Sequence, residues 1–208
     1  MTDRDRPVSE RRVTRTRATR ETRVEIELDL DGTGEASVAT GIGFYDHLLT
    51  SFAYHGCLDL EVRATGDLEV DEHHTVEDVA LAVGAAIAEA FGDRAGIRRF
   101  GEAAVPMDEA LARCVLDLSG RPYAVLDLPF RSERIGALPT QLIQHALESL
   151  AQAGGLTIHL SAHGRNDHHM AEAAFKALGR AIRAAVEPDP RRAGVPSTKG
   201  SLGDRASA

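Results

Sequence analysis

The chain carries one short pattern twice, and this repeat limits its possible folds more than any other feature of the sequence. Two histidines followed by two other residues and a glutamate occur at residues 73–77 and again at residues 168–172, so the second copy starts 95 positions after the first. The apolar residues keep the same spacing: positions 76, 79, 80, 83, 87 and 91 correspond to positions 171, 174, 175, 178, 182 and 186. A register that persists over a whole helix predicts an internal duplication.

Hydrophobic periodicity predicts the elements of the duplicated unit. Apolar and acidic residues alternate from Val24 to Asp31, as in a strand with one wet face, whereas residues 73–91 show the stripe of an amphipathic helix. The other predicted segments are strands at 36–38 and 58–62 and a helix at 44–54, then strands at 102–108, 111–118, 122–128 and 156–160 and helices at 140–152 and 168–186. This order predicts an α+β fold of two β-β-α-β-α units, each a small sheet with helices on one face, like the second domain of a small-subunit ribosomal protein.

The same reasoning divides the chain into four segments. We expect a flexible arm at residues 1–12, a first half-repeat at 13–95, a second half-repeat at 96–187 and a C-terminal tail at 188–208. The arm is rich in arginine, and the tail carries a Ser-Thr-Lys-Gly sequence at 197–200. Hydroxyl groups, a cation and a flexible glycine together suit the binding of a phosphate group.

Composition and charge restrict the class of protein. The formal net charge of -8 argues against a general nucleic-acid binder, because such a protein needs a basic face to neutralise phosphates. No apolar run approaches the ~20 residues that a helix needs to cross a bilayer, and the arginine-rich start lacks the apolar segment of a secretory signal. Cys57 and Cys114 have neither metal-type spacing nor the density of a disulfide scaffold. We therefore expect a cytoplasmic protein without nucleic-acid or membrane partners.

The repeated pattern has the spacing of a metal-binding helix. Residues four positions apart share one helix face, so His73 and Glu77 can present a nitrogen and an oxygen to one ion, as can His168 and Glu172. The side chain of His74 points about 100° away from that of His73, and it cannot easily reach the same ion. A second ion is therefore implied.

Two lone histidines extend the pattern. His47 precedes the first histidine pair by 26 positions, and His145 precedes the second pair by 23. We expect two reciprocal sites, one formed by His73, Glu77, His145 and His169 and the other by His47, His74, His168 and Glu172. Imidazoles and a carboxylate without a thiolate suit Mn, Fe, Co, Ni or Zn in an open site rather than a closed structural zinc site. Asp71 and Asp167 stand just before the two pairs and are expected to cap the helices.

Five segments of the chain carry a resemblance to a known family. Residues 20–22, 41–47, 71–78, 166–172 and 196–200 closely resemble the imidazoleglycerol-phosphate dehydratase family of histidine biosynthesis. The resemblance implies a manganese-dependent hydro-lyase that removes water from D-erythro-imidazole glycerol phosphate, a small phosphate substrate, to give imidazole acetol phosphate. It also implies two Mn²⁺ ions per active site, with other divalent transition metals as alternatives. Trimers that assemble into a homo-oligomer of 24 subunits, with active sites between neighbouring subunits, are part of the same expectation.

The resemblance also assigns roles to single residues. The implied metal ligands are His47, His73, His74, Glu77, His145, His168, His169 and Glu172. The implied substrate contacts are Glu21, His47, Arg99, Arg121, Ser197, Thr198 and Lys199, of which Arg99, Arg121, Ser197 and Lys199 surround the phosphate. Glu21 is the first candidate for acid-base catalysis, and Glu172 is the second because metal ligation lowers the basicity of a carboxylate.

Two other functions remain compatible with the histidine pattern. A di-metal hydrolase could use similar ligands to generate hydroxide, and a metal-assembled storage or structural shell could use them only to join subunits. Activity on imidazole glycerol phosphate separates both alternatives from a dehydratase.

Overall fold

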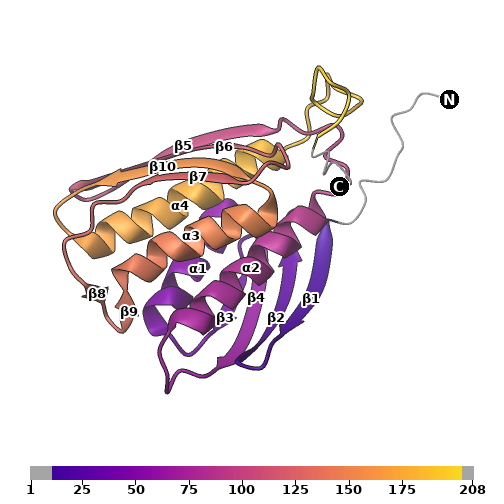
Figure 1. Ribbon diagram of the computed structural model, residues 1–208. Coiled ribbons are helices and arrows are strands. Elements are labelled where there is room, and N and C mark those ends of the chain that lie inside the picture. Colours follow the sequence, from indigo (N-terminus) through magenta and orange to yellow (C-terminus); the bar gives the residue numbers. More distant parts are fainter. Residues whose placement is uncertain (1–10, 203–208) are drawn as a thin grey trace.

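The computed structural model describes residues 11–202, in which the two halves of the chain repeat one α+β fold (Figure 1). The first half contains β1 (Arg12–Ala18), β2 (Thr22–Asp29), β3 (Ala36–Ala39), α1 (Gly43–Gly56), β4 (Asp59–Gly66) and α2 (His73–Ala90). The second half contains β5 (Phe100–Met107), β6 (Ala110–Asp117), β7 (Tyr123–Asp127), α3 (Thr140–Gly154), β10 (Thr157–His163) and α4 (Asp167–Val186). A hairpin of two short strands, β8 (Arg134–Ile135) and β9 (Leu138–Pro139), separates β7 from α3. The predicted fold class is confirmed.

The two sheets have the same topology. Their strand orders are β1-β2-β4-β3 and β5-β6-β10-β7, and in each sheet the last strand runs parallel to its neighbour while the other pairs are antiparallel. Each half therefore has three strands of its sheet before its first helix; the strand predicted at 102–108 corresponds to β5, whereas β1 is an additional strand. Periodicity did not predict β1 because its residues alternate between arginine and threonine, and Val13 is its one buried apolar residue. Residues 1–10 of the expected flexible arm lie outside the described residues, whereas Arg12 already belongs to this strand.

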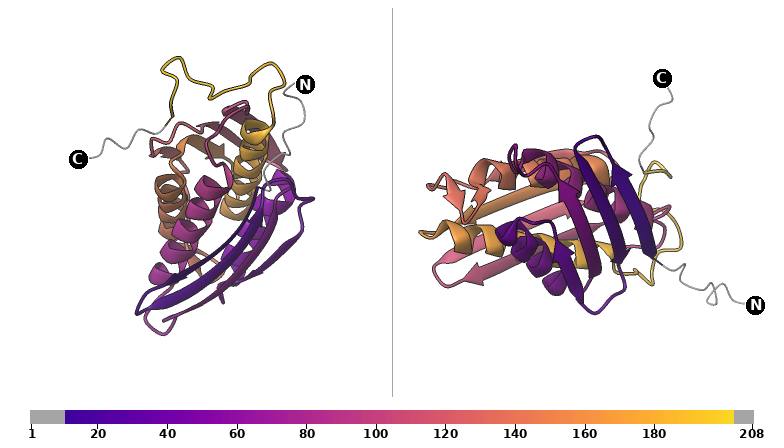
Figure 2. Two further views of the ribbon diagram at one scale, coloured as in Figure 1. Left: turned by 90° about the vertical axis from the view of Figure 1, so that its right-hand side faces the viewer. Right: turned by 90° about the horizontal axis from the view of Figure 1, so that it is seen from below.

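The four helices form a layer between the two sheets (Figures 1 and 2). Helix α2 packs on β1 and β2, and α4 packs on β5 and β6, so each long helix covers its own sheet. Within the helix layer, α1 packs against α4 and α2 packs against α3, so each of these pairs joins the two halves. Among the described residues, no helix combines the length and the apolar character needed to cross a membrane.

Glycines allow the paired helices to approach closely. A Cβ atom added to Gly84 of α2 would lie 2.5 Å from the backbone oxygen of Leu150 in α3. A Cβ atom added to Gly179 of α4 would lie 2.2 Å from the backbone oxygen of Phe52 in α1. The two glycines occupy equivalent positions in the repeat, so the duplication preserves the same close helix crossing twice.

Alanine at either crossing should destabilise the protein. Backbone atoms of the facing helix cannot move aside as a side chain can, so we expect Gly84→Ala and Gly179→Ala each to lower the free energy of unfolding by about 1–3 kcal/mol. Denaturant titration of the variants measures this loss. Gly43→Ala is the matched control, because no atom lies within 4 Å of its added Cβ. Wild-type stability in both crossing variants would contradict the packing argument.

Candidate metal centre

The first group of candidate ligands joins α1 to α4. Glu172 Oε2 lies 3.0 Å from Nε2 of His47 and 3.2 Å from Nε2 of His168. The ligand atoms of these three residues all lie within 4.8 Å of one another. Because α1 and α4 belong to different halves of the chain, this group depends on the packing between the halves.

The second group joins α2 to α3 and is the pseudo-symmetric counterpart of the first. The carboxylate oxygens of Glu77 lie 3.7 Å from Nε2 of His73 and 3.7 Å from Nε2 of His145. Nε2 of His145 is buried and has no hydrogen-bond partner. A buried nitrogen without a partner, beside a second imidazole and a carboxylate, fits a divalent transition metal ion.

The second histidine of each repeated pattern lies outside these groups. His74 and His169 belong to neither of the two groups found among residues 11–202. Nδ1 of His74 lies 3.0 Å from Oδ2 of Asp67, and Nδ1 of His169 lies 2.9 Å from Oε2 of Glu109. One chain therefore brings together three of the four ligands expected for each ion, and adjacent histidines point in different directions as predicted.

Polar side chains before the long helices satisfy their first amides. Asp71 Oδ1 accepts a hydrogen bond from the amide of His73 at 2.7 Å, although Glu72 occupies the N-cap position of α2 and its side chain makes no capping hydrogen bond. In the second half, Asn166 accepts the equivalent bond from the amide of His168 at 2.9 Å. Asp167, which was expected to cap this helix, does not do so because the register of the repeat places Asn166, one residue earlier, at the position equivalent to Asp71.

Asp167 instead fixes the loop that leads into the β8–β9 hairpin. Its Oδ2 atom accepts hydrogen bonds from the amides of Arg131 and Ser132 at 3.0 and 2.6 Å. Glu72, the equivalent residue of the first half, binds the guanidinium group of Arg134 at 3.1 and 3.0 Å. Both long helices thus hold one loop segment next to the candidate ligands.

A cation distinguishes the two ligand groups. Lys176 Nζ lies 2.7 Å from Oε1 of Glu172, whereas Leu81 stands at the equivalent position of the first half. Burial alone would raise the pKa of Glu172, but hydrogen bonds from Lys176 and His47 outweigh burial and hold this pKa at about 2. A carboxylate with so low a pKa is a good anionic ligand and a weak base at neutral pH.

Glu21, the first candidate for acid-base catalysis, lies in the turn between β1 and β2. Its Oε2 atom is 3.9 Å from Nδ1 of His74. Glu21 and Asp67 both line an open groove of about 440 Å³ beside the start of α2. The structure therefore brings Glu21 next to one of the predicted metal ligands.

The predicted phosphate-binding arginines gather around Asp117 at the end of β6. Arg99 donates to both oxygens of Asp117 at 2.6 and 2.9 Å, and its third nitrogen donates to the backbone oxygen of Pro196 at 2.8 Å. Arg121 is two-thirds exposed and lies 3.9 Å from the same carboxylate. Arg99 thus connects the end of the second sheet to the C-terminal segment.

The C-terminal segment presents its polar residues as a turn. Ser197 Oγ accepts a hydrogen bond from the amide of Lys199 at 3.2 Å, and the side chains of Thr198 and Lys199 are exposed. In Figure 1 this segment and the β8–β9 hairpin lie at opposite ends of the molecule. The predicted phosphate-binding residues are therefore grouped with one another, but far from the two ligand groups of the same chain.

The length of β6 indicates how far the predicted phosphate-binding residues lie from His169. Glu109, the partner of His169, precedes the first residue of β6, and Asp117 is its last residue. An eight-residue strand is about 24 Å long. The substrate expected from the resemblance, a glycerol phosphate with one imidazole ring, is too small to span this distance within one chain.

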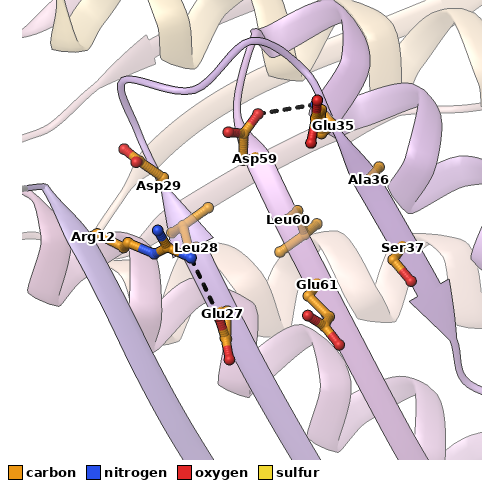
Figure 3. Close-up of a pocket in the computed structure, with 10 residues that line it drawn as sticks. All are labelled: Arg12, Glu27, Leu28, Asp29, Glu35, Ala36, Ser37, Asp59, Leu60 and Glu61. Atoms are coloured by element: carbon orange, nitrogen blue, oxygen red, sulfur yellow. Dashed lines mark hydrogen bonds and ion pairs between the residues drawn. The ribbon is translucent and has the colours of Figure 1, made fainter.

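A groove of about 400 Å³ on the first sheet is unrelated to these residues (Figure 3). Arg12 and Glu27 form an ion pair across it at 3.5 Å, and Asp59 accepts three hydrogen bonds from the amides of residues 33–35. Acidic side chains dominate the lining, and no histidine takes part: the lining residues are Arg12, Glu27, Leu28, Asp29, Glu35, Ala36, Ser37, Asp59, Leu60 and Glu61. Such a surface repels a phosphate rather than binding it.

Three charged residues near the ligands were not singled out from the sequence. Asp67, Glu109 and Lys176 all contact candidate ligands, yet none belongs to the repeated pattern. The 95-residue spacing of the histidine pattern does not identify the counterpart of Glu109, because strands β2 and β6 repeat at a different spacing. β2 begins at residue 22 and β6 at residue 110, a difference of 88 that pairs Glu109 with Glu21.

Comparisons with known proteins agree with one another. A family model described as imidazoleglycerol-phosphate dehydratase matches residues 40–182. The imidazoleglycerol-phosphate dehydratase of Acidiphilium cryptum is 58% identical over 189 residues, which cover 90% of this chain and 96% of that protein. The enzyme of the same name from Methanothermobacter thermautotrophicus is 57% identical over 195 residues, which cover 94% of this chain and 100% of that protein.

Solved structures give the same result. The imidazoleglycerol-phosphate dehydratase of Staphylococcus aureus superimposes with a TM-score of 0.77 at 33% identity and covers 86% of this chain and 99% of its own. The structure from Pyrococcus furiosus has a TM-score of 0.77 at 34% identity and covers 90% of this chain and 100% of its own. Fold, sequence and the doubled ligand groups thus point to one conclusion: the chain belongs to the imidazoleglycerol-phosphate dehydratase family.

Proposed function

We propose that this dehydratase is a manganese-dependent hydro-lyase that converts D-erythro-imidazole glycerol phosphate to imidazole acetol phosphate in the cytoplasm, as a step of histidine biosynthesis. The observation that carries the proposal is the pair of pseudo-symmetric ligand groups, each with two imidazoles and one carboxylate, in a member of this family. This donor set suits Mn²⁺ and related divalent metals.

The eight candidate ligands would hold two metal ions per active site. One ion would be held by His73, Glu77 and His145, and the other by His47, His168 and Glu172, with His169 and His74 as the fourth protein ligands. Bound ions would acidify the imidazole ring of the substrate, so that the ring electrons could help to expel the hydroxyl group from the attached side-chain carbon. His47 would also lie within reach of the bound substrate.

The proton that must be removed lies on a carbon with no adjacent carbonyl group, so a carboxylate alone would remove it slowly. Glu21 is the base that the surroundings favour, because its carboxylate is exposed and accepts no hydrogen bond from residues 11–202. Glu172, with a pKa of about 2, is better suited to binding an ion. Arg99, Arg121, Ser197, Thr198 and Lys199 would bind the phosphate of the substrate.

An assembly of identical subunits would complete the site. We infer that His74 and His169, whose Nδ1 atoms are occupied, turn their Nε2 atoms toward ions bound by neighbouring chains. The phosphate-binding residues, about a strand length away from His169, would likewise serve a neighbour's ligand group. The expected arrangement is a shell of 24 subunits built from trimers.

The outer face of the second sheet offers a surface for such contacts. Val115 and Val125 flank His159 on adjacent strands, and Leu111 lies next to His163. All three apolar side chains are exposed, whereas the outward positions of β1, β2 and β4 in the first sheet carry mainly arginine, threonine and acidic residues. These exposed apolar side chains support contact with another copy of the chain at this sheet.

The function is tested by the product that the manganese-loaded protein makes from imidazole glycerol phosphate. A dehydratase should form a keto product and release no inorganic phosphate. Release of phosphate would support the di-metal hydrolase instead, and a protein that binds manganese without changing the substrate would support the storage or structural shell.

A further inference from the structure

We propose that Asp67 and Glu109 are positioning residues that aim His74 and His169 at the ions, and that Asp67 thereby leaves Glu21 free for proton transfer. The inference rests on the proposed function, since it concerns how the second histidine of each pattern is presented. It adds two residues outside the ligand set and a reason why one half of the duplication carries the acid-base group.

The hydrogen bonds fix which ring nitrogen is available. An ionised carboxylate can only accept, so the Nδ1 atoms that lie 3.0 Å from Asp67 and 2.9 Å from Glu109 must carry the hydrogen. The remaining nitrogen, Nε2, then has a free lone pair for an ion. A carboxylate on the far side of a ligating histidine fixes the orientation of the ring and raises its basicity.

The position of Asp67 beside His74 is unfavourable for the stability of the fold. Its second oxygen, Oδ1, is buried and has no hydrogen-bond partner. A buried polar atom without a hydrogen-bond partner destabilises the folded state. The presence of a carboxylate at this position is therefore better explained by its contact with His74 than by the stability of the fold.

The two carboxylates come from different places in the repeat. Glu109 precedes β6 just as Glu21 precedes β2, so these two turn glutamates are structural counterparts. Asp67 lies in the loop between β4 and α2, which spans residues 67–72. The corresponding loop of the second half spans only residues 164–166, which are glycine, arginine and asparagine and include no carboxylate.

The longer loop explains the different positions of the two glutamates. Glu109 binds the ring of His169 directly and also accepts hydrogen bonds from the amides of residues 165 and 166 at 3.1 and 2.8 Å. Glu21 lies 3.9 Å from the ring of His74, where Asp67 holds the closer place. The side chain of Glu21 is 53% exposed, compared with 22% for Glu109. The carboxylate of Glu109 is thus bound to His169, whereas the carboxylate of Glu21 remains available.

Alanine substitutions of Asp67 and Glu109 distinguish the positioning of the histidines from the availability of Glu21. We expect Glu109→Ala to weaken Mn²⁺ binding by about 10- to 100-fold, measured by titration calorimetry on the assembled full-length protein. In Asp67→Ala, Glu21 can move onto Nδ1 of His74, so Mn²⁺ affinity should fall less than in Glu109→Ala while kcat falls at least about 10-fold. Glu69→Ala is the matched control, because it removes an exposed charge from the same loop and should leave both quantities unchanged.

A double variant tests whether Glu21 can take the place of Asp67 beside His74. Asp67→Ala combined with Glu21→Ala should weaken Mn²⁺ binding by about 10-fold more than the two single variants predict together. Additive effects would overturn the link between Asp67 and Glu21, and unchanged affinity in Asp67→Ala, Glu109→Ala and the double variant would overturn the positioning role. If the wild-type protein binds Mn²⁺ but makes no keto product, the proposed function fails while the positioning test still stands.

Discussion

Replacement of Glu21 by glutamine is expected to lower kcat by about 10²- to 10⁴-fold and to leave the manganese content and the subunit number unchanged. The substitution keeps the shape of the side chain but removes its ability to take a proton. Glu172 cannot easily replace it, because Lys176 and His47 hold its pKa at about 2 and its second oxygen faces two histidines. Steady-state turnover at saturating imidazole glycerol phosphate, with metal analysis of the same sample, measures the effect.

Glu69→Gln provides the control for this experiment. Glu69 lines the same groove as Glu21 and is exposed, so its substitution removes the same charge without touching a histidine. We expect wild-type turnover for this variant. If Glu21→Gln also turned over within about twofold of the wild type, another group would have to transfer the proton.

Removal of the metal is expected to abolish turnover, by more than about 100-fold, and to break the assembly into smaller oligomers. The reason is that each ligand group of one chain holds three of four expected ligands, and His74 and His169 would complete the ions of neighbouring chains. Native mass spectrometry or light scattering after dialysis against a strong chelator measures the change, and added Mn²⁺ should restore both mass and turnover. Chelator presaturated with Mn²⁺ is the control. A full-sized assembly in the metal-free protein would contradict the sharing of ligands between chains.

The sequence was sufficient to predict the long helices and the clustering of most candidate ligands. The register after residues 73–77 and 168–172 depends only on helix geometry, which does not change with tertiary context. Strand β1 was not predictable in this way, because Val13 alone among its apolar residues reaches the core. Strands β8 and β9 have two residues each, too few to show any period.

The contacts of Asp67 and Glu109 could not be inferred from a single repeat spacing. Strands β1 and β2 recur 88 positions later as β5 and β6, β4 recurs 98 positions later as β10, and the histidine patterns are 95 positions apart, because the second half contains the β8–β9 hairpin but a shorter loop before its long helix. An alignment of the two β-turns would have paired Glu21 with Glu109. No pattern along one chain can reveal whether a ligand comes from a neighbouring chain, since that depends on the assembly.

The way in which the helices pair has a consequence for the origin of the protein. Each ligand group takes one residue from a short helix of one half and two residues from a long helix of the other half, as α1 with α4 and α3 with α2. A half-length ancestor could not have formed either group alone. Two copies related by a twofold axis, however, would have formed both groups at once and identically. Fusion of two such copies would make this ancient dimer permanent and allow Asp67 and Lys176 to evolve in one half each.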